Sequence, residues 1–170
     1  MNKIYRKEIY SPLGTLIVCA SENGICLLEF SDGKGLETEL KQIEKSLKAK
    51  IKDGENPLFA ILETELNLYF QGKLKQFSVP LQPIGTDFQK KVWEELCKIS
   101  YGKTISYQRQ ANNLDIPKSV RAVANANGQN KIAILIPCHR VIGTNGKLTG
   151  YAGGIWRKEK LLEIEKNHFI

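Results

Sequence analysis

The sequence lacks the features of a membrane or secreted protein. It contains no apolar run long enough to cross a bilayer, and its first residues resemble a β-strand rather than a signal peptide. Its four cysteines show no spacing typical of a disulfide framework, which favours a reducing compartment. We therefore expect a cytoplasmic protein that does not associate with membranes.

Metal-binding and phosphate-binding motifs are scarce as well. The chain has only two histidines, His139 and His168, so Cys19 and Cys26 have too few partners for a four-ligand zinc site. These two cysteines are predicted to be core thiols. The glycine-rich segment 149–154 lacks the spacing and the lysine of a phosphate-binding loop. We expect no metal and no cofactor.

The sequence does have a globular composition and an uneven distribution of charge. It is 42% hydrophobic and 25% charged, so its 170 residues can form one or two domains with a hydrophobic core. Residues 1–85 carry 11 Lys and Arg against 11 Asp and Glu, whereas residues 86–170 carry 14 against 7. The basic half suggests a polyanionic partner, above all nucleic acid, and a solubilising lysine surface is the alternative.

The first half predicts a small α/β domain over residues 1–82. Apolar segments bounded by turn residues predict strands at 13–20, 25–30 and 77–81. Apolar residues recur at helical spacing from 36 to 47, and a second helix is expected at 58–70. This half carries no obvious chemistry.

The second half, residues 83–170, predicts a mainly helical domain. Thr86 and Gln89 form a capping-box pattern at the start of a helix, and Cys97 beside its apolar stripe is predicted to be a core thiol. A short helix at 107–112 follows, and another begins with Pro117 at its first position. Two short helices joined by a tight turn in a basic domain are typical of a helix-turn-helix.

The outer face of the helix that follows Pro117 is small and cationic. It is predicted to present Lys118, Arg121, Ala122 and Asn125, and Ala126 is also expected to let a backbone approach closely. Small residues around one projecting arginine fit the minor groove of DNA better than readout of base edges. An ordinary solvated face is the alternative.

Cys138 is the candidate nucleophile, because it stands next to His139 and Arg140. It follows the apolar run 132–136, which predicts a buried strand or extended segment that Pro137 ends. A cysteine held beside basic groups loses its proton more easily, and the thiolate is the nucleophile. A structural thiol and half of a zinc site are the alternatives.

Glu165 is the acid that the sequence turns inward. In the final helix, predicted at 156–166, it shares a face with Leu161 and Leu162, and a buried acid needs a partner. His139 is the candidate partner, with its Nδ1–H donating to the carboxylate. Cys138, His139 and Glu165 would then form a relay that activates the thiol.

Two loops lie between the candidate nucleophile and the final helix. Residues 143–147 predict the turn of a hairpin, and the glycine-rich segment 149–154 can pass close to a planar ligand.

The surroundings of Cys138 resemble the active-site region of the O6-alkylguanine-DNA alkyltransferases, also called methylated-DNA–protein-cysteine methyltransferases. The similar segments are 136–143, 150–154 and 157–159, together with 105–107 and 121–126 in the helix-turn-helix and parts of 69–81. The resemblance implies an N-terminal ribonuclease H-like α/β domain and a C-terminal winged-helix-like DNA-binding domain. It also implies a monomer that binds double-stranded DNA through the minor groove.

The resemblance further implies the reaction. The alkyl group of O6-alkylguanine, and also of O4-alkylthymine, would pass irreversibly to Cys138 in a single turnover, after the base has been rotated out of the duplex. His139 would act as base through a water, Glu165 would orient His139, and Tyr107 would aid rotation and protonate the departing guanine.

Other positions receive supporting roles from the same resemblance. DNA contacts would come from Lys118, Ala122 and Asn125, while Arg121 would fill the space of the rotated base. Asn130 would brace the turn before the active-site segment, and the guanine pocket would be lined by Val141, Tyr151, Ala152 and Gly153.

The sequence differs from the family pattern at two positions, and two other functions are alternatives. Lys131 stands where the family often has proline, which we expect to loosen the turn, and Ala152 replaces a serine of some members. One rival is a lesion-binding protein without transfer, whose relatives have tryptophan in place of Cys138. The other is a cysteine hydrolase, which would need an oxyanion hole and no basic helix-turn-helix.

Overall fold

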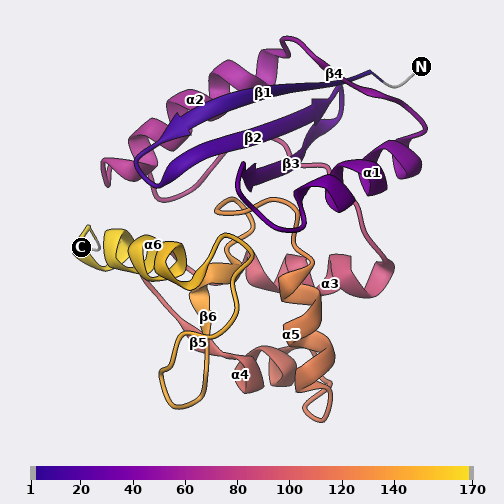
Figure 1. Cartoon of the computed structure of the whole chain (residues 1–170). Helices are drawn as coiled ribbons and strands as arrows, with labels where there is room; N and C mark the ends of the chain where they lie inside the picture. Colours follow the sequence, from indigo (N-terminus) through magenta and orange to yellow (C-terminus); the bar gives the residue numbers. More distant parts are fainter. Residues whose placement is uncertain (1–2, 169–170) are drawn as a thin grey trace. The chain divides into compact units, whose positions relative to one another are not determined.

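The computed structural model describes residues 3–168, and the chain forms two compact units, Met1–Ile84 and Gly85–Ile170 (Figure 1). The predicted domain boundary after residue 82 lies two residues before this division. Among the described residues, no helix combines the length and the apolar composition that crossing a bilayer requires.

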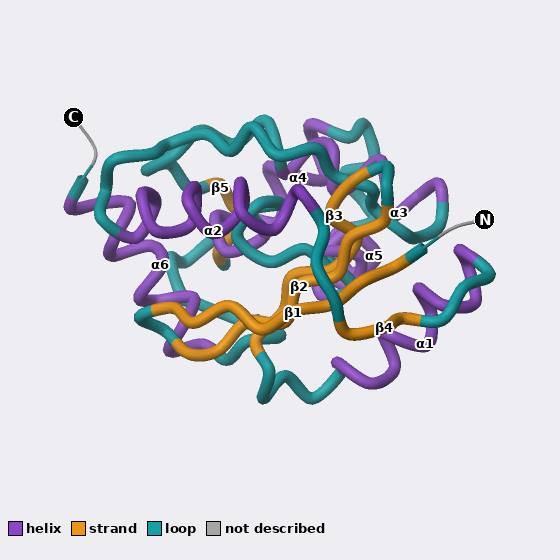
Figure 2. The backbone as a smooth tube through the Cα atoms, turned by 90° about the horizontal axis from the view of Figure 1, so that it is seen from above, coloured by secondary structure: helices purple, strands orange, loops and turns teal. Residues whose placement is uncertain are grey.

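The first unit contains a four-stranded sheet and two helices (Figure 2). Its elements are β1 (Ile4–Ser11), β2 (Gly14–Ser21), β3 (Gly24–Phe30), α1 (Leu36–Leu47), β4 (Ile51–Asp53) and α2 (Pro57–Phe70). The strand order is β3-β2-β1-β4. Neighbouring strands are antiparallel from β3 to β1, and the edge strand β4 runs parallel to β1.

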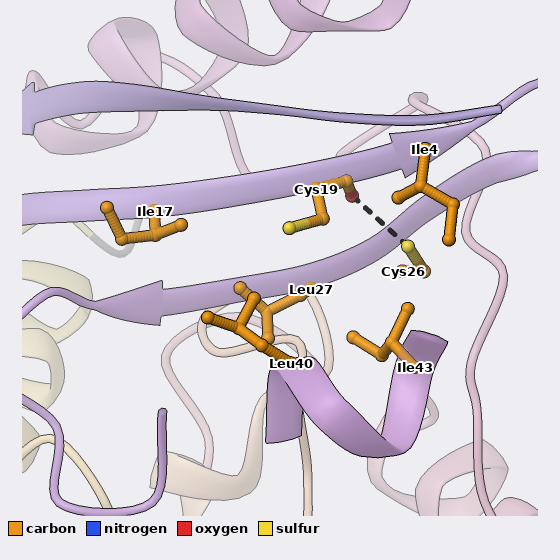
Figure 3. Packing of buried hydrophobic residues seen from close by; sticks show 7 residues of the cluster. All are labelled: Ile4, Ile17, Cys19, Cys26, Leu27, Leu40 and Ile43. Carbon is orange, nitrogen blue, oxygen red and sulfur yellow. Dashed lines mark hydrogen bonds between the residues drawn. The ribbon is translucent and has the colours of Figure 1, made fainter. Parts of the chain in front are cut away.

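The core of this unit lies on both faces of the sheet. Strand β3 is buried along its whole length, which requires cover on each face. Leu40 and Ile43 of α1 pack with Cys19 and Cys26 on one side (Figure 3), and α2 lies on the other side (Figure 1). The prediction that these cysteines are core thiols is confirmed, and burial raises the pKa of Cys26 to about 12.

The predicted strand at 77–81 is wrong. Only Leu81 makes a bridge, to Ile25, and the residues before it are irregular. The reason lies in Glu65, whose carboxylate accepts hydrogen bonds from the backbone N–H groups of Ser78 and Val79 at 2.9–3.1 Å. A strand would donate these groups to its neighbour, so the buried acid replaces sheet pairing here.

The second unit is mainly helical. Its elements are α3 (Asp87–Leu96), β5 (Ile105–Ser106), α4 (Tyr107–Asn113), α5 (Val120–Gly128), the 3-10 turn η1 (Cys138–Arg140), β6 (Val141–Ile142) and α6 (Ile155–Asn167). The predicted capping box is confirmed, since Thr86 and Gln89 each accept the other's backbone N–H. Strands β5 and β6 pair in parallel.

The predicted helix-turn-helix consists of α4 and α5, which a reciprocal pair of buried amides joins. Gln110 Nε2 donates to Asn127 Oδ1 at 2.8 Å, and Asn127 Nδ2 donates to Gln110 Oε1 at 2.7 Å. The Trp93 indole donates to the carbonyl of Ala126 at 2.9 Å, which ties α5 to α3. These bonds fix the orientation of α5.

Three details of this region differ from expectation. Helix α5 begins at Val120, because the backbone carbonyl of Pro117 accepts a hydrogen bond from Gln108 within the preceding turn. Cys97 is exposed and not a core thiol, because it follows the last residue of α3 and leaves the apolar stripe. Ala126 is buried under Trp93, so it does not belong to the outer face.

Candidate active site

Asn130, just beyond α5, holds the segment that carries Cys138. Its Oδ1 accepts from the backbone N–H of Ile132 at 2.9 Å, and its Nδ2 donates to the carbonyl of Ile136 at 2.8 Å. The same Nδ2 lies 3.4 Å from Cys138 Sγ. One buried amide thus uses its donors and its acceptor to connect the end of α5 to the thiol.

The segment between Asn130 and Cys138 is a compact turn, so the predicted strand or extended segment at 132–136 is wrong. Ile134 is buried at a φ of 72°, and the N–H of Leu135 donates to Ala133 O at 2.8 Å to close a γ-turn. A β-branched residue in this conformation costs about 1–3 kcal/mol. The hydrogen bonds of Asn130 hold both ends of this strained turn.

Cys138 is half-buried at the start of η1. Its backbone N–H donates to Ile136 O at 2.8 Å, with Pro137 at the centre of a second tight turn. Two consecutive tight turns leave the thiol with little positional freedom, so the backbone aims it before any substrate arrives.

His139, the residue that follows Cys138, forms a buried pair with Glu165 of α6. His139 Nε2 lies 2.6 Å from Glu165 Oε2, and both side chains are at most 1% exposed. The expected partner was right but the atom was wrong, since Nε2 and not Nδ1 faces the acid. Because an ionised carboxylate can only accept, Nε2 carries the proton of the neutral ring and Nδ1 is its acceptor. Nδ1 is buried and has no hydrogen-bond partner among the described residues.

Arg140 also contacts Glu165, although the sequence interpretation gave it no role. Its Nε donates to Glu165 Oε1 at 2.8 Å, and a second nitrogen donates to Glu165 Oε2 at 3.1 Å. A third nitrogen donates to the carbonyl of Ile99 at 2.6 Å. A buried acid requires a cation, and that requirement was the signal that could have identified Arg140.

The electrostatics leave a neutral imidazole beside an ionised acid. Burial lowers the pKa of His139 below its usual value and outweighs the hydrogen bond to Glu165, which acts in the opposite direction. Burial by itself would raise the pKa of Glu165, but His139 and Arg140 hold it well below its usual range. A neutral imidazole can accept a proton, so this pair is suited to general-base chemistry.

Tyr107 lies at the start of α4, and the pairing of β5 with β6 brings it beside the strand that follows η1. Its hydroxyl donates to Thr149 O at 2.9 Å. Lys158, fully buried, donates to the same carbonyl at 2.9 Å and to the Tyr107 hydroxyl at 3.4 Å. Lys158 was also missed, although its spacing from Leu161 already placed it on the buried face of α6.

The expected pocket residues lie on β6 and on the loop before α6. Val141 is buried, Tyr151 is half-buried and Ala152 is exposed. The carbonyl of Gly153 accepts from Arg157 at 3.1 Å. The predicted turn at 143–147 is confirmed by the bond from Gly143 N to Lys147 O at 2.8 Å, but no strand pair follows it, so the hairpin is wrong.

The expected DNA-contacting side chains form one exposed face. The residues concerned are Lys118, Arg121, Ala122 and Asn125, all of them exposed on α5 or the turn before it. The structure therefore pairs Glu165 with His139, the residue that follows Cys138, and places the cationic face on an element that contains none of these three residues. Within residues 3–168, no cluster of three or more His, Cys, Asp or Glu side chains could hold a metal. Lys131 is buried with its amino group 5.5 Å from the Trp93 ring.

Comparisons with protein families cover nearly the whole chain. Residues 4–83 match the ribonuclease-like domain of 6-O-methylguanine DNA methyltransferase, and residues 87–167 match its DNA-binding domain. A methylated-DNA–protein-cysteine methyltransferase of Methanosarcina barkeri is 44% identical over 97% of this chain and 99% of its own length. That of Mycobacterium leprae is 39% identical over 98% and 95%.

Solved structures give the same result. The O6-methylguanine methyltransferase of Mycobacterium tuberculosis superposes with a TM-score of 0.82 at 40% identity, covering 98% of this chain and 95% of that one. A structure of the mycobacterial protein in complex with DNA gives a TM-score of 0.81 at 41% identity, with 96% and 94% covered.

Proposed function

Because the chain belongs to the O6-methylguanine DNA methyltransferase family, it binds DNA and repairs O6-methylguanine by transferring the methyl group to one of its own cysteines, and we propose that this cysteine is Cys138. The supporting observation is the network of Asn130, His139, Glu165 and Arg140 around it. The other three cysteines have no such network; Cys19 and Cys26 are buried in the core of the first unit.

The thiol must lose its proton before it attacks. We propose that the proton passes to Nδ1 of His139, through one bridging water, while Nε2 donates to Glu165. The carboxylate stabilises the imidazolium that forms, and the N–H of Asn130 stabilises the thiolate. The sulfur then forms a bond to the methyl carbon as the bond from that carbon to O6 breaks.

The departing guanine keeps the electron pair of the broken bond and needs a proton. We propose that the hydroxyl of Tyr107 supplies it, and that the neighbouring ammonium of Lys158 stabilises the negative charge left behind. A thioether does not release its methyl group spontaneously, so each molecule reacts once. O4-alkylthymine presents the same bond type and is a proposed second substrate.

The duplex conceals the methyl carbon within the base stack, so the base must be rotated outward. We propose that the exposed face of α5, with Lys118, Ala122 and Asn125, enters the minor groove of double-stranded DNA. Arg121 projects from this face and would occupy the space that the rotated base leaves. The glycine-rich loop from Gly150 to Gly154 would then receive the guanine together with Val141.

Three further expectations concern the domain bounds, the cellular compartment and the oligomeric state. Residues 1–82 would form the ribonuclease H-like domain and residues 83–170 the DNA-binding alkyltransferase domain. All four cysteines are free thiols, which supports a reducing, cytoplasmic setting. The monomeric state stays a prediction.

Replacement of Cys138 by serine tests the proposal. The Cys138→Ser variant should lose methyl transfer while its affinity for undamaged duplex stays within a few-fold, because Cys138 does not belong to the exposed face of α5. Transfer that persists in this variant would move the acceptor to another cysteine. Turnover of an acyl substrate by the unaltered protein would instead indicate a hydrolase.

A further inference from the structure

Lysines gather on one part of the first unit, although residues 1–85 carry equal numbers of acidic and basic side chains. They surround the C-terminal end of α1 and the edge strand β4. We call them the lysine cluster; its members, all exposed, are Lys3, Lys41, Lys45, Lys48, Lys50 and Lys52. The neutral total of this half therefore hides a local concentration of positive charge.

The lysine cluster borders two adjoining hollows. A cavity of about 710 Å³ is lined by Lys3, Lys48, Lys50 and Lys52 around a floor that includes Ile4, Tyr5 and Leu47. A second cavity of about 620 Å³ shares Lys48, Ala49 and Lys50 with the first and adds Lys41 and Lys45. Both volumes lie in the range of ordinary ligand sites.

Acidic partners do not neutralise the lysine cluster. Glu44 is the one carboxylate that lines either hollow; its Oε2 accepts the N–H of Ile51 at 2.8 Å, and its Oε1 lies 3.9 Å from Lys50. Asp53, which follows Lys52 in the chain, forms an ion pair with Arg6 at 3.2 Å. Lys41, Lys45 and Lys48 form no ion pair with any residue from 3 to 168.

Local effects explain single lysines but not the whole cluster. Lys45 and Lys48 lie at the negative end of the α1 dipole, which favours a cation. Lys52 on the edge strand β4 discourages pairing with another sheet. Neither effect requires six like charges to share one concave surface. Like charges that are close together repel one another, and salt screens this repulsion only in part. An anionic partner would offset that repulsion.

We infer that the lysine cluster binds the phosphates of double-stranded DNA as a contact surface distinct from the outer face of α5. DNA is the polyanion that this protein meets in its reaction. Ammonium groups on flexible stems bind phosphates as point charges and do not read sequence. The surface therefore adds salt-sensitive affinity for any sequence and takes no part in methyl transfer itself.

Lysine footprinting tests this inference on the unaltered full-length chain. The protein is briefly acetylated with and without a long undamaged duplex, and the modified lysines are identified by mass spectrometry. Lys48, Lys50 and Lys52 should be protected several-fold, whereas the exposed Lys34 and Lys73, which line neither hollow, should not. Protection confined to residues 85–170 would overturn the inference.

A pair of matched variants measures the contribution to binding. Lys50→Gln/Lys52→Gln and the control Lys34→Gln/Lys73→Gln remove the same charge from the same unit. The first should flatten the dependence of log affinity on log salt by about 1.8, the value for two phosphate contacts, and the control should not. Both should react with the free base O6-methylguanine at the unaltered rate and show the same thermal midpoint. An equal change in both slopes would show that net charge alone governs the salt dependence, and it would contradict a specific DNA contact by the lysine cluster.

Discussion

Glu165 of α6 binds His139 and Arg140 of η1 at the same time. Its Oε2 lies 2.6 Å from His139 Nε2, and its Oε1 accepts from Arg140 Nε at 2.8 Å. The backbone N–H of Gly102 also donates to Oε1 at 3.2 Å. The acid is therefore held from several directions, and it can orient the imidazole while the guanidinium keeps it ionised.

Glu165→Gln should slow methyl transfer by about 100-fold, because the amide keeps the shape but not the charge that supports His139 as a base. The pH profile of Cys138 alkylation should shift to higher pH. The variant should also lose about 3 kcal/mol of stability, since Arg140 is left buried without its acid. Alkylation rates across pH, with thermal unfolding alongside, measure both effects. An unaltered pH profile would leave Glu165 as a structural acid only.

Stability should fall as the pH drops below about 6.5. Burial lowers the pKa of His139 in the folded state below 6.5, so the unfolded state binds a proton that the folded state excludes. Glu165 has a depressed pKa in the folded state, so its contribution is present above about 4.5 and is lost at still lower pH. Chemical denaturation at a series of pH values measures the slope.

His139→Gln should flatten the stability profile between pH 6.5 and 5, because the buried imidazole whose pKa is lowered is then absent. A slope that survives in His139→Gln would show that the imidazole does not exclude the proton.

Asn130→Ala should lower the free energy of unfolding by about 1–3 kcal/mol, since it leaves Ile132 N buried without a partner and removes one of the two hydrogen bonds that Ile136 O accepts. It should also slow the reaction with the free base, because the strained turn at Ile134 loses its anchor. Asn125→Ala, on the exposed face of α5, should leave stability and the free-base reaction unchanged and affect only duplex repair. Matching effects of the two variants on the free base would remove Asn130 from the support of the thiol.

Arg121→Ala should slow repair of duplex DNA far more than reaction with the free base, because only the duplex requires a base to be unstacked, at a few kcal/mol. The ratio of the two rates is the relevant measurement. Lys118→Ala is the control, since loss of one phosphate contact should weaken binding without changing that ratio. Equal slowing on both substrates by Arg121→Ala would exclude the proposed role.

The residue types of the site could be predicted from the sequence, but the backbone conformation of the site could not. Spacing alone turned Glu165 inward toward a partner, and the neighbourhood of Cys138 indicated a nucleophile. The apolar run 132–136 was misread because composition cannot reveal the positive φ of Ile134 or the side-chain hydrogen bonds of Asn130 that allow it. The choice between Nδ1 and Nε2 of His139 depends on the position of α6, which no local pattern encodes.

Strand errors have a similar origin. The segment 77–81 has the composition of a strand, yet the distant Glu65 takes its N–H groups. Strand β4 has only three residues, too few for a periodic signal. A contact by a single buried side chain therefore decided the first case, and the short length of the strand decided the second.

The location of the methyl group after reaction shows directly whether Cys138 is the acceptor. The protein is incubated with duplex DNA that contains O6-methylguanine, and its intact mass and peptide map are then measured. We predict a gain of one methyl group per molecule, located on Cys138 and unaffected by further incubation with excess substrate. A methyl group on Cys19, Cys26 or Cys97, or no gain in mass while the lesion disappears, would contradict it.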